Sequence, residues 1–229
     1  MNRVVLTGTG VPVPDPDRAG AGTLVDIDGV RLQVDAGRGT VQRLTAAMAP
    51  VQSLDAVLLT HHHSDHLTGL ADLALSRWLG GALRTTIVAP AGPTARFAAG
   101  LLDQWQDDIA VRIAHAGHDG SPAVDVVAFE PTSTPQVVWR TGSVVVTAVA
   151  VHHEPVLPAV AYRIDGLSGS VVVSGDTTVC DEVETLATGA DVLVHEVRLR
   201  AFAEQATDTH YEPIAAYHAD AVDLGAAAQ

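Results

Sequence analysis

The sequence is poor in cysteine and in long apolar runs, and each shortage removes a class of protein. One cysteine, Cys180, among 229 residues cannot form an intrachain disulfide, so a disulfide-stabilised secreted fold is excluded and a cytoplasmic location is expected. No apolar run approaches the length of a membrane span, so no membrane partner is expected. The N-terminal segment "MNRVVLTGTGVP" lacks the long apolar region and the small-residue cleavage site of a signal peptide.

Basic residues are also scarce. The chain has 13 lysines and arginines against 27 aspartates and glutamates, which gives a formal net charge of −14. A general nucleic-acid surface is usually basic because it must neutralise phosphates, so this balance disfavours tight binding of a polyanion. The overall charge does not exclude a local basic patch. The 47% hydrophobic content predicts a substantial core.

The pattern of apolar and turn residues predicts mixed α and β structure with predominantly antiparallel sheets. No low-complexity linker and no solenoid repeat interrupts the chain, so a single domain over residues 1–229 is expected. Strands are predicted at 3–7, 23–37 (a hairpin around Asp28-Gly29), 54–60, 84–90, 109–114, 124–130, 143–151, 159–164, 170–175 and 191–197. Helices are predicted at 40–48, 67–81, 92–106 and 217–229.

The stretch "THHHSDH" gathers three consecutive histidines, an aspartate and a fourth histidine behind a predicted buried strand. In extended geometry His61 and His63 share a face, whereas His62 points the other way. Asp65 and His66 follow where the next helix begins, and a turn there can direct both toward the same point. Imidazole nitrogens and carboxylate oxygens are ligands that suit zinc and similar divalent metals. The segment therefore predicts a metal site.

The spacing His-x-His-x-Asp-His resembles the signature of the metallo-β-lactamase superfamily. Later segments resemble, in the same order, those of its ribonuclease Z-like branch. These segments are "LTGTGVPVPDPDRAG" (6–20), "VDAGRGTVQRL" (34–44), "HEPVLPAVAYRI" (153–164), "VVVSGDTT" (171–178), "DVLVHE" (191–196) and "YHADAVDLGAA" (217–227). The resemblance implies an α+β fold, the four-layer αββα sandwich of the superfamily, in a chain that lacks its C-terminal strand.

The resemblance also implies two bound zinc ions, with manganese or iron as alternatives. Three imidazoles would hold the first ion, a carboxylate and an imidazole would hold the second, and one aspartate would bridge both. In that order, the implied ligands are His61, His63 and His153; Asp65 and His66; and Asp176.

His152 is the alternative to His153 as the third imidazole of the first site. His153 is preferred because the family pattern places this histidine two residues before a proline-valine pair and nine before a tyrosine. Pro155, Val156 and Tyr162 occupy those positions in this chain.

The implied chemistry is hydrolysis. Two dications can share one hydroxide at neutral pH, which attacks the substrate, and a protonated group must then meet the leaving oxygen. The resemblance nominates Glu196 and His218 as that relay and places Asp65 with them among the catalytic residues. Asp35 is implied as a carboxylate that orients a metal-bound histidine.

The leading hypothesis is therefore a zinc-dependent, ribonuclease Z-like phosphodiesterase acting on a small phosphodiester or on RNA. An arylsulfatase, a lactonase or a cyclic-phosphodiester hydrolase is the alternative on the same scaffold. A catalytically silent metal-binding protein is the alternative of another class. A homodimer is compatible with each of these hypotheses.

Two departures from the family pattern bear on these expectations. The second metal of the family receives a further histidine near the C-terminus, and after His218 this chain has none, so either the chain is truncated or the site is incomplete. His195, His210 and His218 are the candidates to replace that ligand. His153 and Asp176 are separated by 23 positions, which leaves no room for the glycine-rich arm that grips tRNA in long-arm relatives. Precursor tRNA is therefore disfavoured, and Arg77, Arg84, Arg198 and Arg200 are the nearest basic candidates should it bind.

Overall fold

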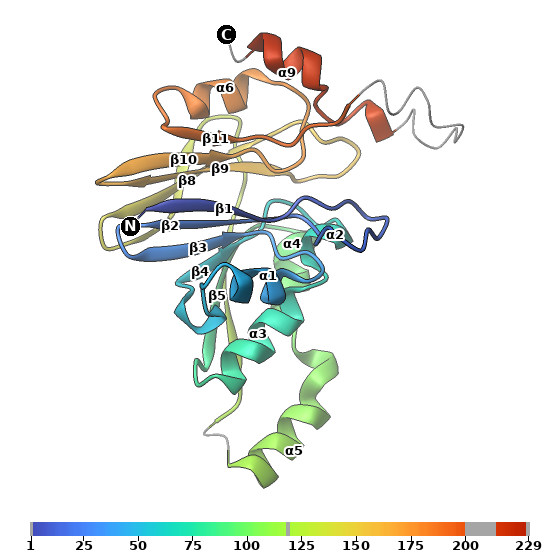
Figure 1. The fold of residues 1–229 in the computed structure, drawn as a ribbon, viewed down its shortest axis with the longest axis vertical. Coiled ribbons are helices and arrows are strands. Elements are labelled where there is room, and N and C mark those ends of the chain that lie inside the picture. The colour runs from blue at the N-terminus through green and yellow to red at the C-terminus, as the bar shows by residue number, and fades with distance from the viewer. Residues whose placement is uncertain (1, 118–119, 200–213, 228–229) are drawn as a thin grey trace. The chain divides into compact units, whose positions relative to one another are not determined.

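The computed structural model describes residues 2–117, 120–199 and 214–227. The chain divides into two units, Met1–Phe129 and Glu130–Gln229, called here the N-terminal unit and the C-terminal unit. Each unit is built on its own β-sheet (Figure 1). The single domain expected from the sequence stays a prediction.

The sheet of the N-terminal unit is mixed. Its strands lie in chain order and are β1 (Arg3–Gly8), β2 (Gly22–Ile27), β3 (Val30–Val34), β4 (Ala56–Leu58), β5 (Arg84–Pro90) and β6 (Ala123–Phe129). β1 to β3 pair antiparallel, whereas β3 to β6 pair parallel. Asp28 and Gly29 both have positive φ, as the predicted turn between β2 and β3 requires.

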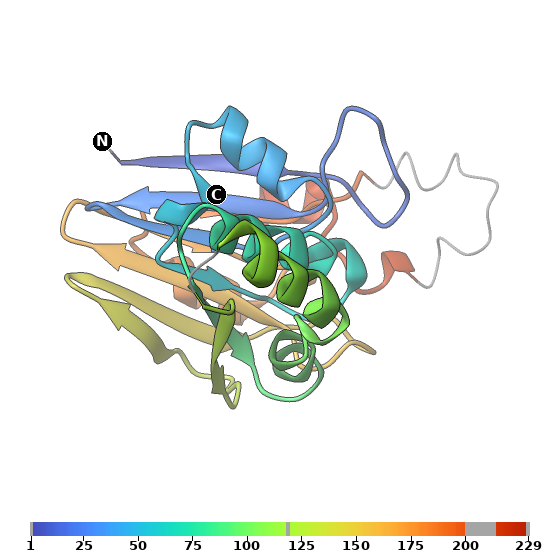
Figure 2. The same ribbon diagram turned by 90° about the horizontal axis from the view of Figure 1, so that it is seen from below.

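The helices of the N-terminal unit are α1 (Thr40–Ala46), α2 (Ser64–Leu67), α3 (Leu70–Leu79), α4 (Pro93–Ala99) and α5 (Gln106–Ala116), with 3₁₀ turns η1 (Val51–Ser53) and η2 (Asp103–Trp105). Three of them pack an apolar face against the sheet: α1 contacts β1, α3 contacts β5, and α4 contacts β5 and β6 (Figure 2). α3 contributes Leu70, Leu73 and Trp78 to a continuous buried core that also takes in Leu24 and Ile87 from the strands. Burial of this face, rather than helix propensity, holds these short helices in place.

The parallel pairing of β3 with β4 brings the residues that follow these two strands to the same edge of the sheet. Val34 at the end of β3 is in register with Leu58 at the end of β4, and the Asp35 N–H donates to the Leu58 carbonyl at 2.8 Å. The carboxyl ends of neighbouring parallel strands meet at the same edge, which is where ligand sites of parallel sheets form. The chain therefore leaves β3 and β4 with Asp35 beside the segment that carries His61.

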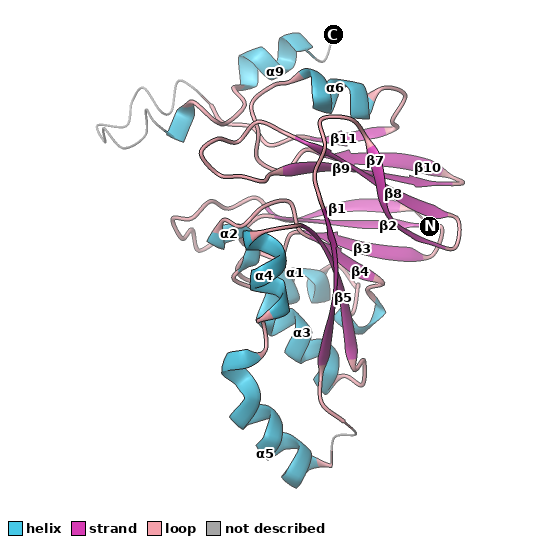
Figure 3. Cartoon of the chain, turned by 180° about the vertical axis from the view of Figure 1, so that it is seen from behind, coloured by secondary structure: helices cyan, strands magenta, loops and turns pink. Residues whose placement is uncertain are grey.

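The sheet of the C-terminal unit has the order β11-β10-β9-β8-β7, and only its β10–β11 pair is parallel. The strands are β7 (Gln136–Thr141), β8 (Val144–Ala150), β9 (Val160–Gly166), β10 (Gly169–Val173) and β11 (Val192–Val194), and the helices are α6 (Asp181–Ala187) and α9 (Ala221–Ala227). α6 lies against β8, β9 and β10 (Figure 3) and buries Val183 and Leu186 there.

Three expectations from the sequence were wrong in detail. Residues 109–114 are part of α5, not a strand: Ile109 and Ile113 fit the strand period of two and the helical spacing of four equally well. Ile109 is buried and Val111 is 58% exposed, as a helix requires. β7 and α6 were not anticipated. The sheet of the N-terminal unit is mixed rather than predominantly antiparallel, because β3 to β6 are joined by crossovers through helices, whereas the sheet of the C-terminal unit is predominantly antiparallel as expected.

The position of Leu73 in the core predicts a large effect of truncation. Leu73→Ala should destabilise the protein by about 2–5 kcal/mol, because a fully buried leucine loses both burial and packing. Leu79→Ala, at the end of the same helix and 39% exposed, is the matched control and should change stability little. Urea unfolding followed by circular dichroism measures both. Equal midpoints for the two variants would contradict this account of the core.

Candidate metal centre

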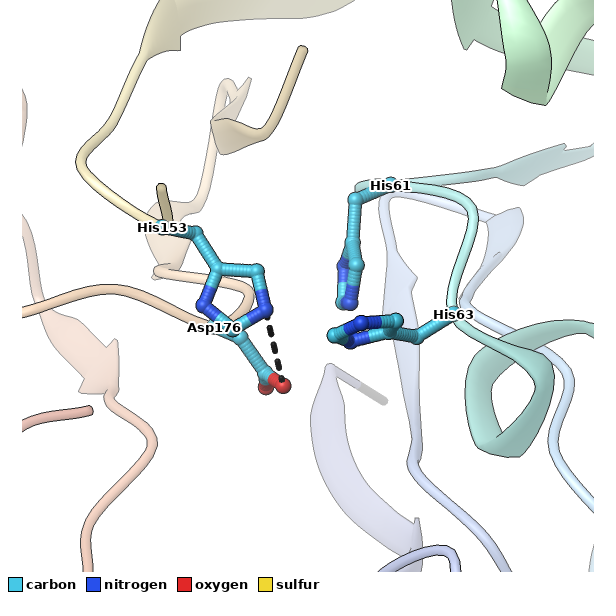
Figure 4. Close-up of side chains that lie close together, drawn as sticks. All are labelled: His61, His63, His153 and Asp176. Atoms are coloured by element: carbon cyan, nitrogen blue, oxygen red, sulfur yellow. Dashed lines mark ion pairs between the residues drawn. The ribbon is translucent and has the colours of Figure 1, made fainter. Parts of the chain in front are cut away.

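The N-terminal unit crowds three imidazoles at the edge described above. His61 and His63 follow β4 in extended conformation, and their ring centroids are 4.8 Å apart in an edge-to-face arrangement (Figure 4). The ring of His66 lies 4.2 Å from that of His61. His61 and His66 are buried, so these rings sit where each polar nitrogen needs a partner.

Helix α2 supplies the other two residues of the motif. His63 is extended (φ −65°, ψ 144°) and immediately precedes the helix, which places Asp65 and His66 in its first turn. Both side chains are buried, and His66 Nε2 lies 3.7 Å from Asp65 Oδ2. The turn predicted from the sequence therefore brings a carboxylate oxygen and an imidazole nitrogen of the motif together.

Asp35 determines how two of these histidines present their nitrogens. Its carboxylate accepts hydrogen bonds from the Thr60 N–H and hydroxyl, each at 2.8 Å, and lies 2.7 Å from His66 Nδ1. Because the carboxylate only accepts, His66 Nδ1 carries the proton and Nε2 carries the lone pair. The Thr60 hydroxyl donates its hydrogen bond to Asp35, so His61 Nδ1, 3.0 Å from the Thr60 oxygen, donates to that oxygen. The lone pair of the His61 ring is therefore on Nε2 as well.

Two glycines allow the segment of Asp35 and helix α2 to approach this closely. A Cβ at Gly37 would lie 2.2 Å from the Asp65 carbonyl oxygen, and one at Gly69 would lie 2.2 Å from the Gly37 carbonyl oxygen. The approach is closed by hydrogen bonds from Ala36 N–H to the His66 carbonyl and from Gly69 N–H to the Ala36 carbonyl, both 2.8 Å. Any side chain at these glycines would force the ligand segments apart.

The C-terminal unit pairs His153 with Asp176. His153 is fully buried, its Nε2 lies 3.8 Å from Asp176 Oδ2 (Figure 4), and its Nδ1 lies 3.1 Å from the Tyr217 carbonyl oxygen. That carbonyl can only accept, so Nδ1 carries the proton and the lone pair is again on Nε2. The side chain of His152 is 51% exposed and lies 3.2 Å from Glu182 on α6. This placement favours His153 over His152, as the sequence pattern does.

Glu196 and His218 form a pair beside these residues. Glu196 Oε1 lies 2.9 Å from His218 Nδ1 and also accepts hydrogen bonds from the N–H groups of Thr177 (3.2 Å) and Ala219 (3.1 Å). The rings of His218 and His153 have centroids 5.0 Å apart. Three donors thus fix the carboxylate of Glu196, and this carboxylate orients the imidazole of His218 next to His153.

Several other predicted or missed residues have definite places. His195 Nδ1 lies 2.6 Å from the Glu196 carbonyl oxygen, and His210 lies outside the described residues.

Thr60 and Thr177 were missed by sequence reasoning, because a threonine carries no signal until its hydroxyl partner, 25 residues away in both cases, is known. Cys180 is a weak nucleophile, because burial raises the pKa of its thiol and so lowers its thiolate fraction.

The donor set fits divalent metal ions. His61, His63, His153 and Asp176 each offer one atom suited to a metal. The Nδ1 atoms of His61, His66 and His153 each lie within hydrogen-bond distance of an oxygen, in the pattern of ligating imidazoles. Each unit therefore offers side-chain atoms of the kind that bind divalent metal ions. In the part of the chain that the structure describes, no helix is long and apolar enough to cross a membrane.

Comparison with known proteins agrees with this chemistry. A family model described as "Beta-lactamase superfamily domain" matches residues 30–228. A protein named Ribonuclease Z from Mycolicibacterium paratuberculosis is 38% identical over 233 residues, covering 100% of this chain and 81% of that protein. The metallo-β-lactamase fold protein YhfI from Bacillus subtilis (TM-score 0.70, 22% identity) covers 99% of this chain and 80% of its own. Human tRNase Z, short form (TM-score 0.70, 20% identity), covers 100% and 88%.

The chain therefore belongs to the metallo-β-lactamase superfamily, and the predicted α+β fold of that superfamily is confirmed. Within the superfamily it belongs to the ribonuclease Z-like branch and is a metal-dependent hydrolase. The family model spans residues from both units, including every candidate ligand named above.

The contacts of Asp35 predict its effect on metal binding. Asp35→Asn should weaken divalent-metal affinity by about 10–100-fold, because an amide has one acceptor oxygen and cannot accept at both positions from Thr60 and His66. Asp55→Asn is the matched control: its exposed carboxylate accepts from the Arg31 N–H and is remote from the histidines. Metal affinity is measured by competition with a chromogenic chelator. Equal affinity of the two variants would refute the assigned role of Asp35.

Proposed function

We propose that the ligands of the two units serve one centre of two zinc ions, and that the protein cleaves phosphodiester bonds in RNA. The observation that carries the proposal is the Glu196–His218 pair held beside His153, which supplies a proton relay next to a metal ligand. The family model spans both units, and relatives named Ribonuclease Z align over the whole chain, which supports a shared centre.

In this proposal, three imidazoles would hold the first zinc ion, a carboxylate and an imidazole would hold the second, and one aspartate would serve both. The residues are His61, His63 and His153; Asp65 and His66; and Asp176. When bound, such ions act as Lewis acids that lower the pKa of water and neutralise the charge that builds on a phosphoryl group. Manganese or iron would supply the same chemistry with oxygen and nitrogen ligands.

In this proposal, His218 and Glu196 carry out the proton transfers. His218 Nδ1 donates to Glu196 Oε1, so His218 Nε2 is the atom that can take and release a proton. The carboxylate of Glu196, fixed by the N–H groups of Thr177 and Ala219, stabilises the positive charge that His218 acquires. A protonated His218 can deliver that proton to the leaving oxygen. Asp35 holds His66 and, through Thr60, His61 in the tautomers that ligation needs.

Two observations bear on which RNA is the substrate: the charge of the chain and the name of its relatives. All 13 basic side chains are arginines, and several candidates for phosphate binding are engaged elsewhere. Arg77 is buried and donates to the carbonyls of Val51 and Leu54, and Arg84 pairs with Asp125. The name of the relatives favours precursor tRNA, whereas the net charge of −14 and the short interval before Asp176 favour smaller phosphodiesters. We propose RNA as the substrate class and let precursor tRNA be decided by experiment.

The decisive measurement is a substrate panel on zinc-loaded protein: precursor tRNA, a bis-aryl phosphate, an aryl sulfate and a lactone. Both phosphodiesters should be cleaved, with precursor tRNA the poorer of the two, and Asp176→Ala should abolish both activities because it removes the ligand shared by the two ions. Cleavage of the sulfate or lactone alone would establish the ester-hydrolase alternative. Zinc binding with no turnover of any substrate would establish a silent metal-binding protein.

The proposed proton relay predicts that substitution of Glu196 lowers the rate of catalysis without lowering zinc affinity. Glu196→Gln should lower kcat by about 10²–10⁴-fold while zinc affinity stays close to that of the unmodified protein, because the residue acts on a proton rather than on a metal. Glu184→Gln on the exposed face of α6 makes the same chemical change and should leave kcat unaltered. A Glu196→Gln protein that loses its zinc would show that Glu196 supports the ligands instead.

A further inference from the structure

We propose that Thr177 is a positioning residue that fixes His153 and Asp176 relative to one another and so sets the metal affinity of the C-terminal unit. The inference rests on the proposed metal centre and adds to it a residue whose hydroxyl contacts neither substrate nor metal. Thr177 is fully buried and directly follows the ligand Asp176.

Two hydrogen bonds join the segment before one ligand to the segment after the other. The His152 N–H donates to Thr177 Oγ1 at 3.2 Å, and the Thr178 N–H donates to the His152 carbonyl at 3.0 Å. Both bonds meet at His152, the immediate neighbour of His153. The N–H and the carbonyl of His152 are thus both hydrogen-bonded to the segment that follows Asp176, which holds the two ligand segments together.

The hydroxyl is the only part of this clamp that a side chain supplies. Its oxygen accepts from His152, and it shares a hydrogen bond with Cys180 Sγ, 3.7 Å away at the start of α6, in which either atom can donate. A valine at position 177 would keep the branched shape and lose both contacts. The His152 N–H would then be left without its acceptor in a partly buried place, which favours movement of the segment that carries His153.

The backbone of Thr177 extends the same clamp to the proton relay. Its N–H donates to Glu196 Oε1 at 3.2 Å, and Glu196 in turn lies 2.9 Å from His218 Nδ1. This bond survives any substitution of the side chain other than proline. The side chain and the backbone of Thr177 therefore have separable roles: the hydroxyl acts on the ligands and the N–H acts on the relay.

A second connection between the same segments is weaker. The imidazole of His152 lies 3.2 Å from Glu182 on α6, but its side chain is half exposed. Exposed ion pairs contribute little, because solvent screens them and the side chains lose entropy. The buried hydroxyl of Thr177 is consequently the principal side-chain link between the two ligand segments among the described residues.

The test uses three variants of the full chain. Thr177→Val keeps the shape and removes the hydroxyl, Thr177→Ser keeps the hydroxyl and removes a buried methyl, and Thr178→Val is the matched control at a neighbour that contributes only its backbone N–H. Zinc affinity is measured by chelator competition, and the thermal midpoint is measured on metal-free protein.

Thr177→Val should weaken zinc binding by about 10–100-fold, the range typical of residues that orient ligands. Thr177→Ser should retain most of the affinity although it unfolds at a lower temperature, and Thr178→Val should bind as the unmodified protein does. Excess zinc should restore most of the kcat of Thr177→Val, because the bond from its N–H to Glu196 is kept.

The inference is overturned if folded Thr177→Val binds zinc with unchanged affinity. It is equally overturned if Thr177→Ser loses as much affinity as Thr177→Val, since packing rather than the hydroxyl would then be responsible. These outcomes differ from failure of the proposed function, in which the unmodified protein itself would bind no zinc or cleave no phosphodiester.

Discussion

A buried imidazole that offers one nitrogen to a metal is fixed in tautomer and orientation by an acceptor for its other N–H, and the local structure around the candidate centre supplies such acceptors. His61 relies on the Thr60 hydroxyl, His66 on the Asp35 carboxylate, and His153 on the Tyr217 carbonyl. Each acceptor comes from a segment that must be brought to the histidine by the fold. The parallel pairing of β3 with β4 places Asp35 beside Thr60, and without it the motif would be a polar loop of unpaired rings.

The motif itself was visible in the sequence because its ligands lie within six residues, and strand-end geometry is enough to predict which rings share a face. The strands that deliver the ligand segments were also predictable, since their apolar runs are short and bounded by turns. α5 was not, because isoleucines at 109 and 113 satisfy both periods and only burial distinguishes them. Thr60 and Thr177 could not be found either: their importance lies in contacts made 25 residues away in sequence, and no local pattern encodes such a contact.

The two units carry different chemical groups. In the N-terminal unit, the Asp35 carboxylate contacts Thr60 and His66 and so fixes the protonation of two imidazoles. In the C-terminal unit, Thr177 contacts the segment of His153 and also Glu196, which contacts His218. Arg77 donates to backbone carbonyls and Arg84 pairs with Asp125, so these two arginines are engaged within the protein. Under the proposed function, phosphate attraction in a chain of net charge −14 would depend on the bound metal ions more than on a broad basic surface.

Gly37 and Gly69 give this arrangement a consequence for protein engineering. Backbone oxygens lie 2.2 Å from where a Cβ would stand at either position, so all nineteen other residues are excluded there by the main chain itself, whatever their chemistry. A library that diversifies the seam between Asp35 and α2 would return only glycine at both. Attempts to retune the metal or the substrate therefore have to leave these two positions unchanged and vary other residues around the ligands.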